Sequence, residues 1–307
     1  MRGLVVKSTG SSYVVRLDGG SDVECHIKGN FRIRGIRSTN PVAVGDFVEV
    51  QGGNGQCTNW ITNIEERKNY IIRKSTNLSK ESHILAANID QVALIVTVNH
   101  PATSTTFIDR FLATCEAYRV RAFIIFNKID LLTPDELERL NELRTLYESI
   151  GYNTLAICAK NFTDSADLLR ELQGRVTLLS GNSGVGKSTL LNALFGREVT
   201  RTGKISDAHD KGMHTTTFSE MYFLDNGAII DTPGIKGFGT IDFEREEVSH
   251  YFREIFRIGR ECRFSNCTHT NEPGCAVQDA LVRGDIAISR YESYLSLLGD
   301  CDEGKYR

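Results

Sequence analysis

The stretch GNSGVGKS (Gly181–Ser188) matches the pattern G-x-x-x-x-G-K-[ST] of a phosphate-binding loop. It lies between residues 175–181, whose apolar run predicts a strand, and residues 187–196, which predict a helix. Glycines let backbone N–H groups converge on phosphate oxygens, and the helix that follows directs its positive end at them. A plain glycine-rich turn is the alternative, but it would not explain the strand and helix on either side. The stretch therefore predicts a nucleoside triphosphate site without specifying the base.

The side chains of this loop have separate expected roles. Lys187 is expected to reach the β- and γ-phosphates and act in catalysis, and the Ser188 hydroxyl is expected to ligate Mg²⁺. The other residues of the loop are expected to contact the nucleotide: Gly181, Asn182, Ser183, Gly184, Val185, Gly186 and Thr189.

A second motif, DTPG (Asp231–Gly234), follows an apolar run that predicts a strand. Asp231 at a strand end can hold Mg²⁺ through water, and the Gly234 N–H can meet the γ-phosphate. The polar segment 203–218 lies between the two motifs and predicts a switch loop, in which Thr216 or one of its neighbours, Thr215 and Thr217, completes the Mg²⁺ shell. A threonine-rich loop that merely leads into a strand is the alternative.

A base-recognising element stands upstream of the phosphate loop, in FNKIDLL (Phe126–Leu132). Asp130 can accept hydrogen bonds from N1–H and the 2-amino group of guanine, whereas adenine lacks both donors. Asn127 is expected to hydrogen-bond the base edge, and Lys128 to lie against its face. A further predicted strand leads into three more expected nucleotide contacts, Cys158, Ala159 and Lys160, with the Ala159 N–H facing guanine O6.

The order of these motifs is unusual. A conventional GTPase runs from phosphate loop to threonine, DxxG, NKxD and SAK, whereas this chain begins with NKID and CAK. Joining the ends of the conventional order and cutting after the DxxG strand produces the order seen here, so we infer a circular permutation. The segment after DTPG then runs directly into the C-terminal region.

Three domains are expected. Residues 1–75 contain about five short alternating runs separated by turn residues, which favours a small β-barrel of the oligonucleotide-binding (OB) type over another small β-domain. Residues 76–243 alternate apolar strands with helices, which predicts a parallel α/β sheet covered on both faces. Residues 244–307 read as helical, with one helix expected over 244–259 and a terminal helix over 285–298.

A metal-ligand pattern lies in the C-terminal region: Cys262-x4-Cys267-x-His269-x5-Cys275. A Cys3His set suits tetrahedral Zn²⁺, and four protein ligands leave no open position, so one structural zinc is expected. Three buried thiols with a surface histidine are the alternative. The other five of the 8 cysteines are scattered, which argues against a disulfide framework.

Composition limits the partners. The net charge of −3 over 307 residues excludes a uniformly basic nucleic-acid-binding surface, so any RNA contact must be local. Candidates are the basic residues around Phe31 and those near the cysteine cluster, although solvated surface explains either set equally well: Lys28, Arg32, Arg34, Arg37; Arg253, Arg257, Arg260. No apolar run reaches the ~18 to 20 residues of a membrane helix, and no export signal is evident, so a cytoplasmic protein without a membrane partner is expected.

The hydrolytic machinery has a gap. Many GTPases place a water-orienting glutamine directly after DxxG, and here that position is Ile235. Slow intrinsic hydrolysis is therefore expected, with the missing group supplied by another residue or by a partner. His214, beside the threonine run, is the candidate within the chain.

Taken together, the motifs resemble the circularly permuted ribosome small subunit-dependent GTPase A family, also called RsgA or YjeQ. The resemblance spans the chain through AANID, NKID, GNSGVGKSTLLNAL, GMHTTT, DTPG and CRFSNCTHTNEPGCAV. It implies an OB barrel, a permuted GTPase domain and a zinc domain, acting as a monomer. It further implies GTP hydrolysis to GDP, stimulated by the small (30S) ribosomal subunit and its rRNA during late assembly. Cys158 departs from the family, in which serine is usual.

Two other classes of function stay open. A GTPase that acts on a membrane or a protein partner would be activated without ribosomes. A GTP-gated RNA-binding module would bind nucleotide with negligible turnover.

Overall fold

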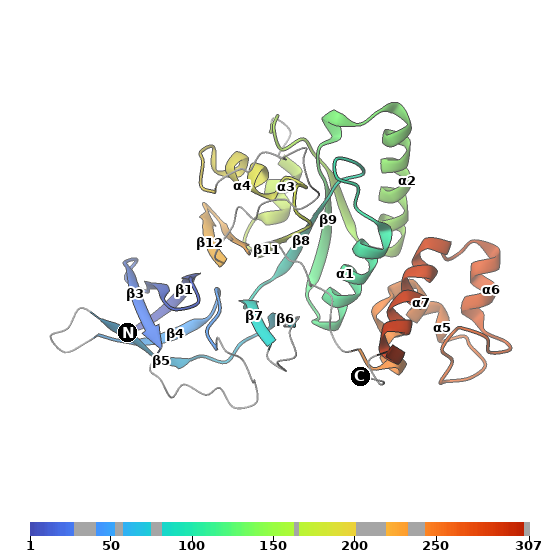
Figure 1. The fold of residues 1–307 in the computed structure, drawn as a ribbon, viewed down its shortest axis with the longest axis horizontal. Coiled ribbons are helices and arrows are strands. Elements are labelled where there is room, and N and C mark those ends of the chain that lie inside the picture. Colours follow the sequence, from blue (N-terminus) through green and yellow to red (C-terminus); the bar gives the residue numbers. More distant parts are fainter. Residues whose placement is uncertain are drawn as a thin grey trace.

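The computed structural model describes residues 1–27, 41–52, 58–74, 82–162, 166–200, 219–232 and 243–303. Figure 1 shows three parts in a row: a blue N-terminal barrel, a central sheet with helices coloured cyan to light orange, and a group of orange to red C-terminal helices. Among the described helices, none is both long enough and apolar enough to cross a membrane.

The N-terminal part is a closed five-stranded barrel. Its strands are β1 (Arg2–Ser8), β2 (Tyr13–Leu17), β3 (Asp22–Ile27), β4 (Phe47–Gln51) and β5 (Asn59–Ile64). Strand β1 pairs with both β2 and β4, and β5 pairs antiparallel with β4 and parallel with β3, which closes the ring. Alternate residues such as Val5, Val15 and Val48 fill the interior. The predicted barrel is confirmed, whereas its basic residues Lys28, Arg32, Arg34 and Arg37 lie outside the described part of the chain.

The central sheet follows the predicted α/β pattern, in the order β10-β9-β8-β11-β13-β12. Its strands are β8 (Gln91–Val96), β9 (Arg121–Phe126), β10 (Asn153–Ala156), β11 (Val176–Ser180), β12 (Ser219–Leu224) and β13 (Gly227–Asp231). All pairings are parallel except that of β12 with β13. Every residue of β8 is buried, because helices cover both faces of the sheet.

The helices divide between the two faces. Helices α1 (Thr105–Ala117) and α2 (Pro134–Ile150) pack on one face, and α3 (Ala166–Leu172) and α4 (Lys187–Phe195) pack on the other. The short helix η1 (Ile129–Leu131) precedes α2. The carboxyl ends of the parallel strands therefore meet at one edge, where the loops after β8, β9, β10, β11 and β13 gather.

The barrel is joined to the sheet by hydrogen-bonded strands. Edge strand β12 pairs antiparallel with β1, and Lys7 forms an ion pair with Glu220 at 3.0 Å across this join. A hairpin of β6 (Tyr70–Lys74) and β7 (Ser82–Ala87) connects the two parts along the chain. A β-carbon on Gly45, in the barrel, would stand 2.1 Å from the Ala87 carbonyl oxygen, so the two backbones are in close contact there. One continuous sheet thus runs through both parts.

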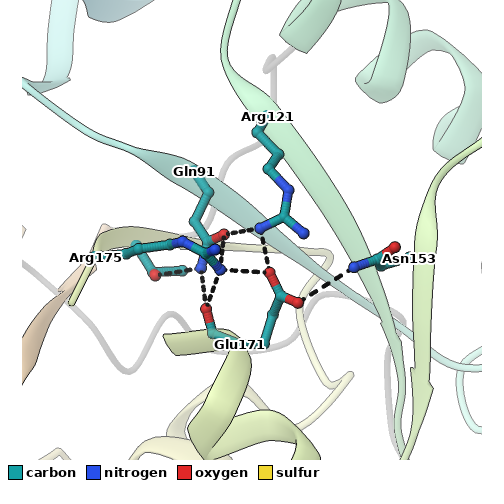
Figure 2. Close-up of polar contacts among 6 residues, drawn as sticks. Gln91, Arg121, Asn153, Glu171 and Arg175 are labelled. Carbon is teal, nitrogen blue, oxygen red and sulfur yellow. Dashed lines mark hydrogen bonds and ion pairs between the residues drawn. The ribbon is translucent and has the colours of Figure 1, made fainter. Parts of the chain in front are cut away.

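A polar cluster holds the connection that the permuted order creates, from α3 to β11 (Figure 2). Glu171, near the end of α3, accepts hydrogen bonds from Arg175 at 2.9 Å and Asn153 at 3.3 Å, and it also pairs with Arg121. The fully buried Gln91 donates to the Glu171 backbone oxygen at 2.8 Å and accepts from Arg121 at 2.7 Å. These side chains stand at the amino ends of the strands, on the opposite edge from the gathered loops.

Replacing Glu171 is expected to weaken this connection. Glu171→Ala leaves Arg121 and Arg175 without their shared carboxylate, so we expect the free energy of unfolding to fall by roughly 1 to 3 kcal/mol. The matched change Glu142→Ala, which removes an exposed ion pair with Arg139 on α2, should cost about 0.5 kcal/mol or less. Denaturant unfolding measures both, and equal losses would contradict a special role for Glu171.

The C-terminal helices differ in one respect from the sequence prediction. The helix expected over 244–259 is two elements, η2 (Arg245–Tyr251) and α5 (Arg253–Gly259), followed by α6 (Ala276–Arg283) and α7 (Ile288–Glu303). Phe252 adopts an extended backbone between η2 and α5, which turns its ring into the core against Tyr294. The expected apolar face is therefore divided: Val248, Phe252 and Ile255 are buried, but Phe256 is exposed.

The C-terminal helices are docked on helix α1 through buried charges. Arg290 of α7, which is 1% exposed, donates to Glu254 at 2.6 and 3.1 Å and to Asp109 of α1 at 2.8 Å. Asp109 also accepts from Tyr147 of α2 at 2.9 Å. Burial alone would lower the pKa of Arg290, but the two carboxylates outweigh it and raise that pKa.

One of the basic residues proposed for RNA contact belongs to the same interface. Arg253 pairs with Glu116 at 2.7 Å, donates to the Gly151 carbonyl oxygen at 2.8 Å and lies over the Tyr152 ring. Its guanidinium therefore binds within the protein, and the expectation that it shares a free basic face is wrong. Arg257 and Arg260 remain exposed.

Candidate functional site

The phosphate loop lies where the sequence placed it, between the end of β11 and the start of α4. Gly181 has a φ of 146°, and a β-carbon there would stand 2.2 Å from the carbonyl oxygen of Ile95 at the end of β8. Glycine is therefore required at this position, because any side chain would push the loop away from the neighbouring strand.

Lys187 already points into the loop. Its Nζ donates to the backbone oxygens of Gly181 and Asn182, each at 2.7 Å. Burial lowers the pKa of Lys187, and the nearby negative charge of Asp231 opposes this shift. The ammonium group is thus held by carbonyl oxygens that an anionic phosphate can replace.

Asn127 ties the two halves of the site together. Its Nδ2 donates to the Val185 carbonyl oxygen of the phosphate loop at 2.8 Å, and its Oδ1 accepts from the Ala159 N–H at 3.0 Å. The side chain is 3% exposed, and a β-carbon on Gly186 would stand 2.3 Å from its Nδ2. These contacts differ from the expectation that Asn127 reads the base edge. They give Asn127 a positioning role within the protein, one that the motif did not reveal.

The same contact changes the expectation for Ala159. Its N–H is engaged by Asn127, so in this structure it is not directed to the position of guanine O6. The carboxylate of Asp130 and the side chain of Lys160 are exposed at the same edge of the sheet, and Cys158 is partly buried beside them. The order NKID then CAK therefore brings side chains from two neighbouring loops to one place, as the strand pattern predicted.

Oxygen donors gather at the ends of β11 and β13. Asp231 ends β13 and is 1% exposed, and Ser188 lies in the first turn of α4. The hydroxyls of Ser180 and Thr232 are buried without a hydrogen-bond partner within the described residues. Carboxylate and hydroxyl oxygens suit Mg²⁺, so the donor set fits this ion. The other expected residues of this region, His214, Thr215, Thr216, Thr217, Gly234 and Ile235, lie outside the described residues.

The C-terminal Cys3His pattern is assembled in space. The ligand atoms of Cys262, Cys267, His269 and Cys275 all lie within 4.8 Å of one another. The Cys262 and Cys275 sulfurs are 3.9 Å apart, and each is 3.5 Å from His269 Nδ1. Zn–S and Zn–N bonds of about 2.3 and 2.0 Å in a tetrahedron separate ligand atoms by roughly 3.5 to 3.8 Å. The four residues therefore fit zinc.

Residues outside the pattern hold the ligand loop in shape. Glu272 accepts from the backbone N–H groups of Thr268 and Thr270 at 2.7 and 2.9 Å. The His269 carbonyl oxygen accepts from Tyr291 at 2.7 Å, and the Thr268 carbonyl oxygen accepts from Tyr294 at 2.7 Å. These supports could not be predicted from the sequence, because only the fold brings α7 beside the ligand loop. A tyrosine pair at helical spacing would have been the only available signal.

A phosphate loop, a DTPG strand end and a base-recognising loop meet at one edge of a parallel sheet, in a chain order that begins with the base-recognising half. This arrangement defines a circularly permuted P-loop GTPase. The chain belongs to the RsgA GTPase family: the model described as RsgA GTPase matches residues 64–241, and the RsgA N-terminal domain matches residues 2–57. It is accordingly a GTP-hydrolysing enzyme.

Similar proteins extend the match over the whole chain. The chain is 58% identical to a small ribosomal subunit biogenesis GTPase RsgA of Phocaeicola vulgatus, with 100% of this chain and 99% of that protein covered. It is 60% identical, with the same coverage, to a protein of that name from Bacteroides fragilis.

Two solved structures share the fold. YjeQ from Thermotoga maritima matches with a TM-score of 0.75 at 33% identity and covers 98% of each chain. YloQ, described as a circularly permuted GTPase, matches with a TM-score of 0.74 at 29% identity and covers 100% of this chain and 96% of its own.

Proposed function

We propose that this GTPase binds the small ribosomal subunit and assists its late maturation, hydrolysing GTP to GDP and phosphate with the subunit as activator. The observation that carries the proposal is similarity along the full chain to relatives that are named small ribosomal subunit biogenesis GTPases. An OB-like barrel on one side of the GTPase sheet and a zinc-ligand domain on the other provide surfaces for rRNA, in agreement with the exposed Arg257 and Arg260.

The nucleotide site is proposed residue by residue. Asp130 hydrogen-bonds guanine, and Lys128 packs against the face of the base. The other side of the base is lined by Cys158, Ala159 and Lys160. Asn127 joins the phosphate loop to the loop that contains Ala159. Lys187 and the loop from Gly181 to Thr189 bind the phosphates. The exposed carboxylate of Asp130 supports this assignment, because the incoming base would bury it against a donor pair.

We propose that residues of this chain would hold the Mg²⁺ that accompanies GTP, and this ion would neutralise charge on the phosphates. Ser188 and Asp231 would hold it, together with Thr216. Gly234 is proposed to meet the γ-phosphate, and His214 to supply the water-positioning group that Ile235 cannot. Lys187 is proposed to act in catalysis by stabilising the negative charge that develops on the phosphates.

The zinc assigned to Cys262, Cys267, His269 and Cys275 is proposed to be a single structural ion, because four protein ligands complete a tetrahedron. We further propose domain limits at 1–75, 76–243 and 244–307, a monomeric state and a cytoplasmic location without a membrane partner. Assembly on a ribosomal subunit and the absence of a membrane-crossing helix among the described residues support the location.

GTP turnover with and without purified small subunits tests the proposal. We expect the subunit to raise kcat by at least about tenfold, because Ile235 cannot orient the attacking water and the partner would supply or position the group that does. Lys187→Ala, assayed with the same subunits, controls for nucleotidases in the preparation. A GTP turnover rate that is the same with and without the subunit would overturn the proposal. Activation by another macromolecule would favour a different partner, and binding without turnover would favour a GTP-gated RNA-binding module.

A further inference from the structure

The loop between β8 and α1, residues 97–104, lies between the phosphate loop and the base-recognising loop. Two hydrogen bonds within the loop fix its shape. The Thr103 N–H donates to the Thr97 carbonyl oxygen at 3.0 Å, and the Thr97 hydroxyl donates to the Pro101 carbonyl oxygen at 2.5 Å. Ser104 then caps α1 by accepting from the Phe107 N–H at 3.2 Å. The loop therefore has a defined shape, although no nucleotide motif includes it.

One side of this loop touches both halves of the nucleotide site. Pro101 Cδ stands 3.4 Å from the place a β-carbon would take on Gly184 of the phosphate loop. The His100 carbonyl oxygen accepts from Lys128 Nζ at 2.5 Å. Lys128 also adopts a left-handed backbone, with a φ of 64°. The loop thus holds the ammonium group of a base-recognising residue beside the phosphate loop.

Asn99 connects this loop to the helix that follows NKID. Its Oδ1 accepts from the His100 N–H at 2.9 Å, and its Nδ2 donates to Glu136 Oε1 at 2.6 Å. Glu136 is itself part of the capping box that starts α2, because its other oxygen accepts from the Thr133 N–H at 2.9 Å. A single side chain therefore fixes His100, which holds Lys128, and the first turn of α2, which follows Asp130.

We propose that the loop 97–104 is a wall of the guanine-nucleotide site and that Asn99 is a positioning residue for guanine binding. This inference rests on the proposed nucleotide site. Asn99 is a positioning residue and is not proposed to contact the nucleotide. It acts by keeping Lys128 and the Asp130 segment preorganised, so that binding does not have to order them.

A reversal of the hydrogen bond between Asn99 and Glu136 tests the role. Asn99→Asp keeps an acceptor for the His100 N–H but sets a second carboxylate against Glu136. Loss of the bond and repulsion together should raise the Kd for GDP by about tenfold, mainly through faster dissociation. Adding Glu136→Gln restores a donor and an acceptor with their roles exchanged, and the glutamine oxygen can still cap Thr133. The double variant should return to within about threefold of the wild-type Kd.

The measurements are the Kd and dissociation rate of a fluorescent GDP analogue, and KM and kcat for GTP. Asn99→Ala, which removes the bond without repulsion, should raise the Kd by about threefold. A positioning role raises KM and leaves kcat at saturating GTP unchanged, which a general loss of stability would not do. Glu142→Gln makes the same chemical change elsewhere on α2 and should match wild type.

Two outcomes would overturn the inference: wild-type GDP affinity in Asn99→Asp, or a double variant that binds as weakly as the single one. Failure of the wild-type protein itself to bind GDP would instead overturn the proposed function, so the two failures are distinguishable.

Discussion

Asp130→Asn is expected to weaken GTP binding by about 10²- to 10³-fold and to create binding of xanthosine triphosphate. The carboxylate of Asp130 can accept two hydrogen bonds from guanine. A hydrogen bond to a charged group contributes about 1.5 to 3 kcal/mol, and every 1.4 kcal/mol of binding free energy changes the dissociation constant about tenfold. Xanthine carries an oxygen in place of the 2-amino group, so an asparagine amide can donate to it. The measurement is the dissociation constant of each nucleotide.

The exchange of preference separates base reading from simple damage. Structural damage would weaken the binding of both nucleotides. If Asp130 reads the base, Asp130→Asn instead weakens the binding of GTP and strengthens the binding of xanthosine triphosphate. Asp135→Asn, an exposed change in the first turn of α2, is the matched control and should leave both affinities as in wild type. An unchanged preference for GTP in Asp130→Asn would show that NKID does not read the base.

Removal of the proposed zinc is expected to unfold the C-terminal helices. Structural zinc contributes about 10 kcal/mol or more in small metal-binding peptides, whereas the core of a segment this short supplies about 3 to 5 kcal/mol. Cys275→Ser, or a chelator at neutral pH, should make residues 244–307 sensitive to proteases. GDP affinity should stay within about threefold of wild type, because the nucleotide loops lie on the central sheet.

Cys301→Ser is the matched control in the same domain. The Cys301 thiol donates to the Leu297 carbonyl oxygen at 3.4 Å, a bond that a serine hydroxyl can also make, and Cys301 lies outside the ligand cluster. Metal content and limited proteolysis are measured together. The metal content should fall in Cys275→Ser and stay as in the wild-type protein in Cys301→Ser. A metal-free protein whose C-terminal helices resist proteases would contradict a structural role for the ion.

Much of the fold followed from local patterns. The five barrel strands and the parallel α/β sheet appear in the regions where alternating or continuous apolar runs predicted them, because burial on one face or on both leaves a direct trace in the sequence. The prediction of a single helix over 244–259 was wrong because it also relied on local apolar spacing alone. Its apolar spacing fits one helix, but Phe252 breaks the helical backbone to place its ring against Tyr294, a partner distant in the chain.

The candidate site shows the same division. Spacing alone predicted the phosphate loop and the four zinc ligands, and the structure brings the zinc ligands together. Spacing did not predict that Asn127 joins Val185 to Ala159, or that Asn99 joins His100 to Glu136. Such bonds depend on which loops become neighbours, and short polar side chains carry no periodic signal of their partners.

The sequence by itself determined the motifs of this protein: a phosphate loop, an NKID loop placed before it, and a Cys3His set within residues 262–275, each encoded in a short stretch of chain. Only the tertiary structure decided how these parts are held. The C-terminal helices dock on α1 through Arg290, which joins Asp109 of α1 to Glu254 of α5, besides following the DTPG segment along the chain. The physical reason is that a buried charge is stable only with its partners, and those partners come from helices far apart in the chain.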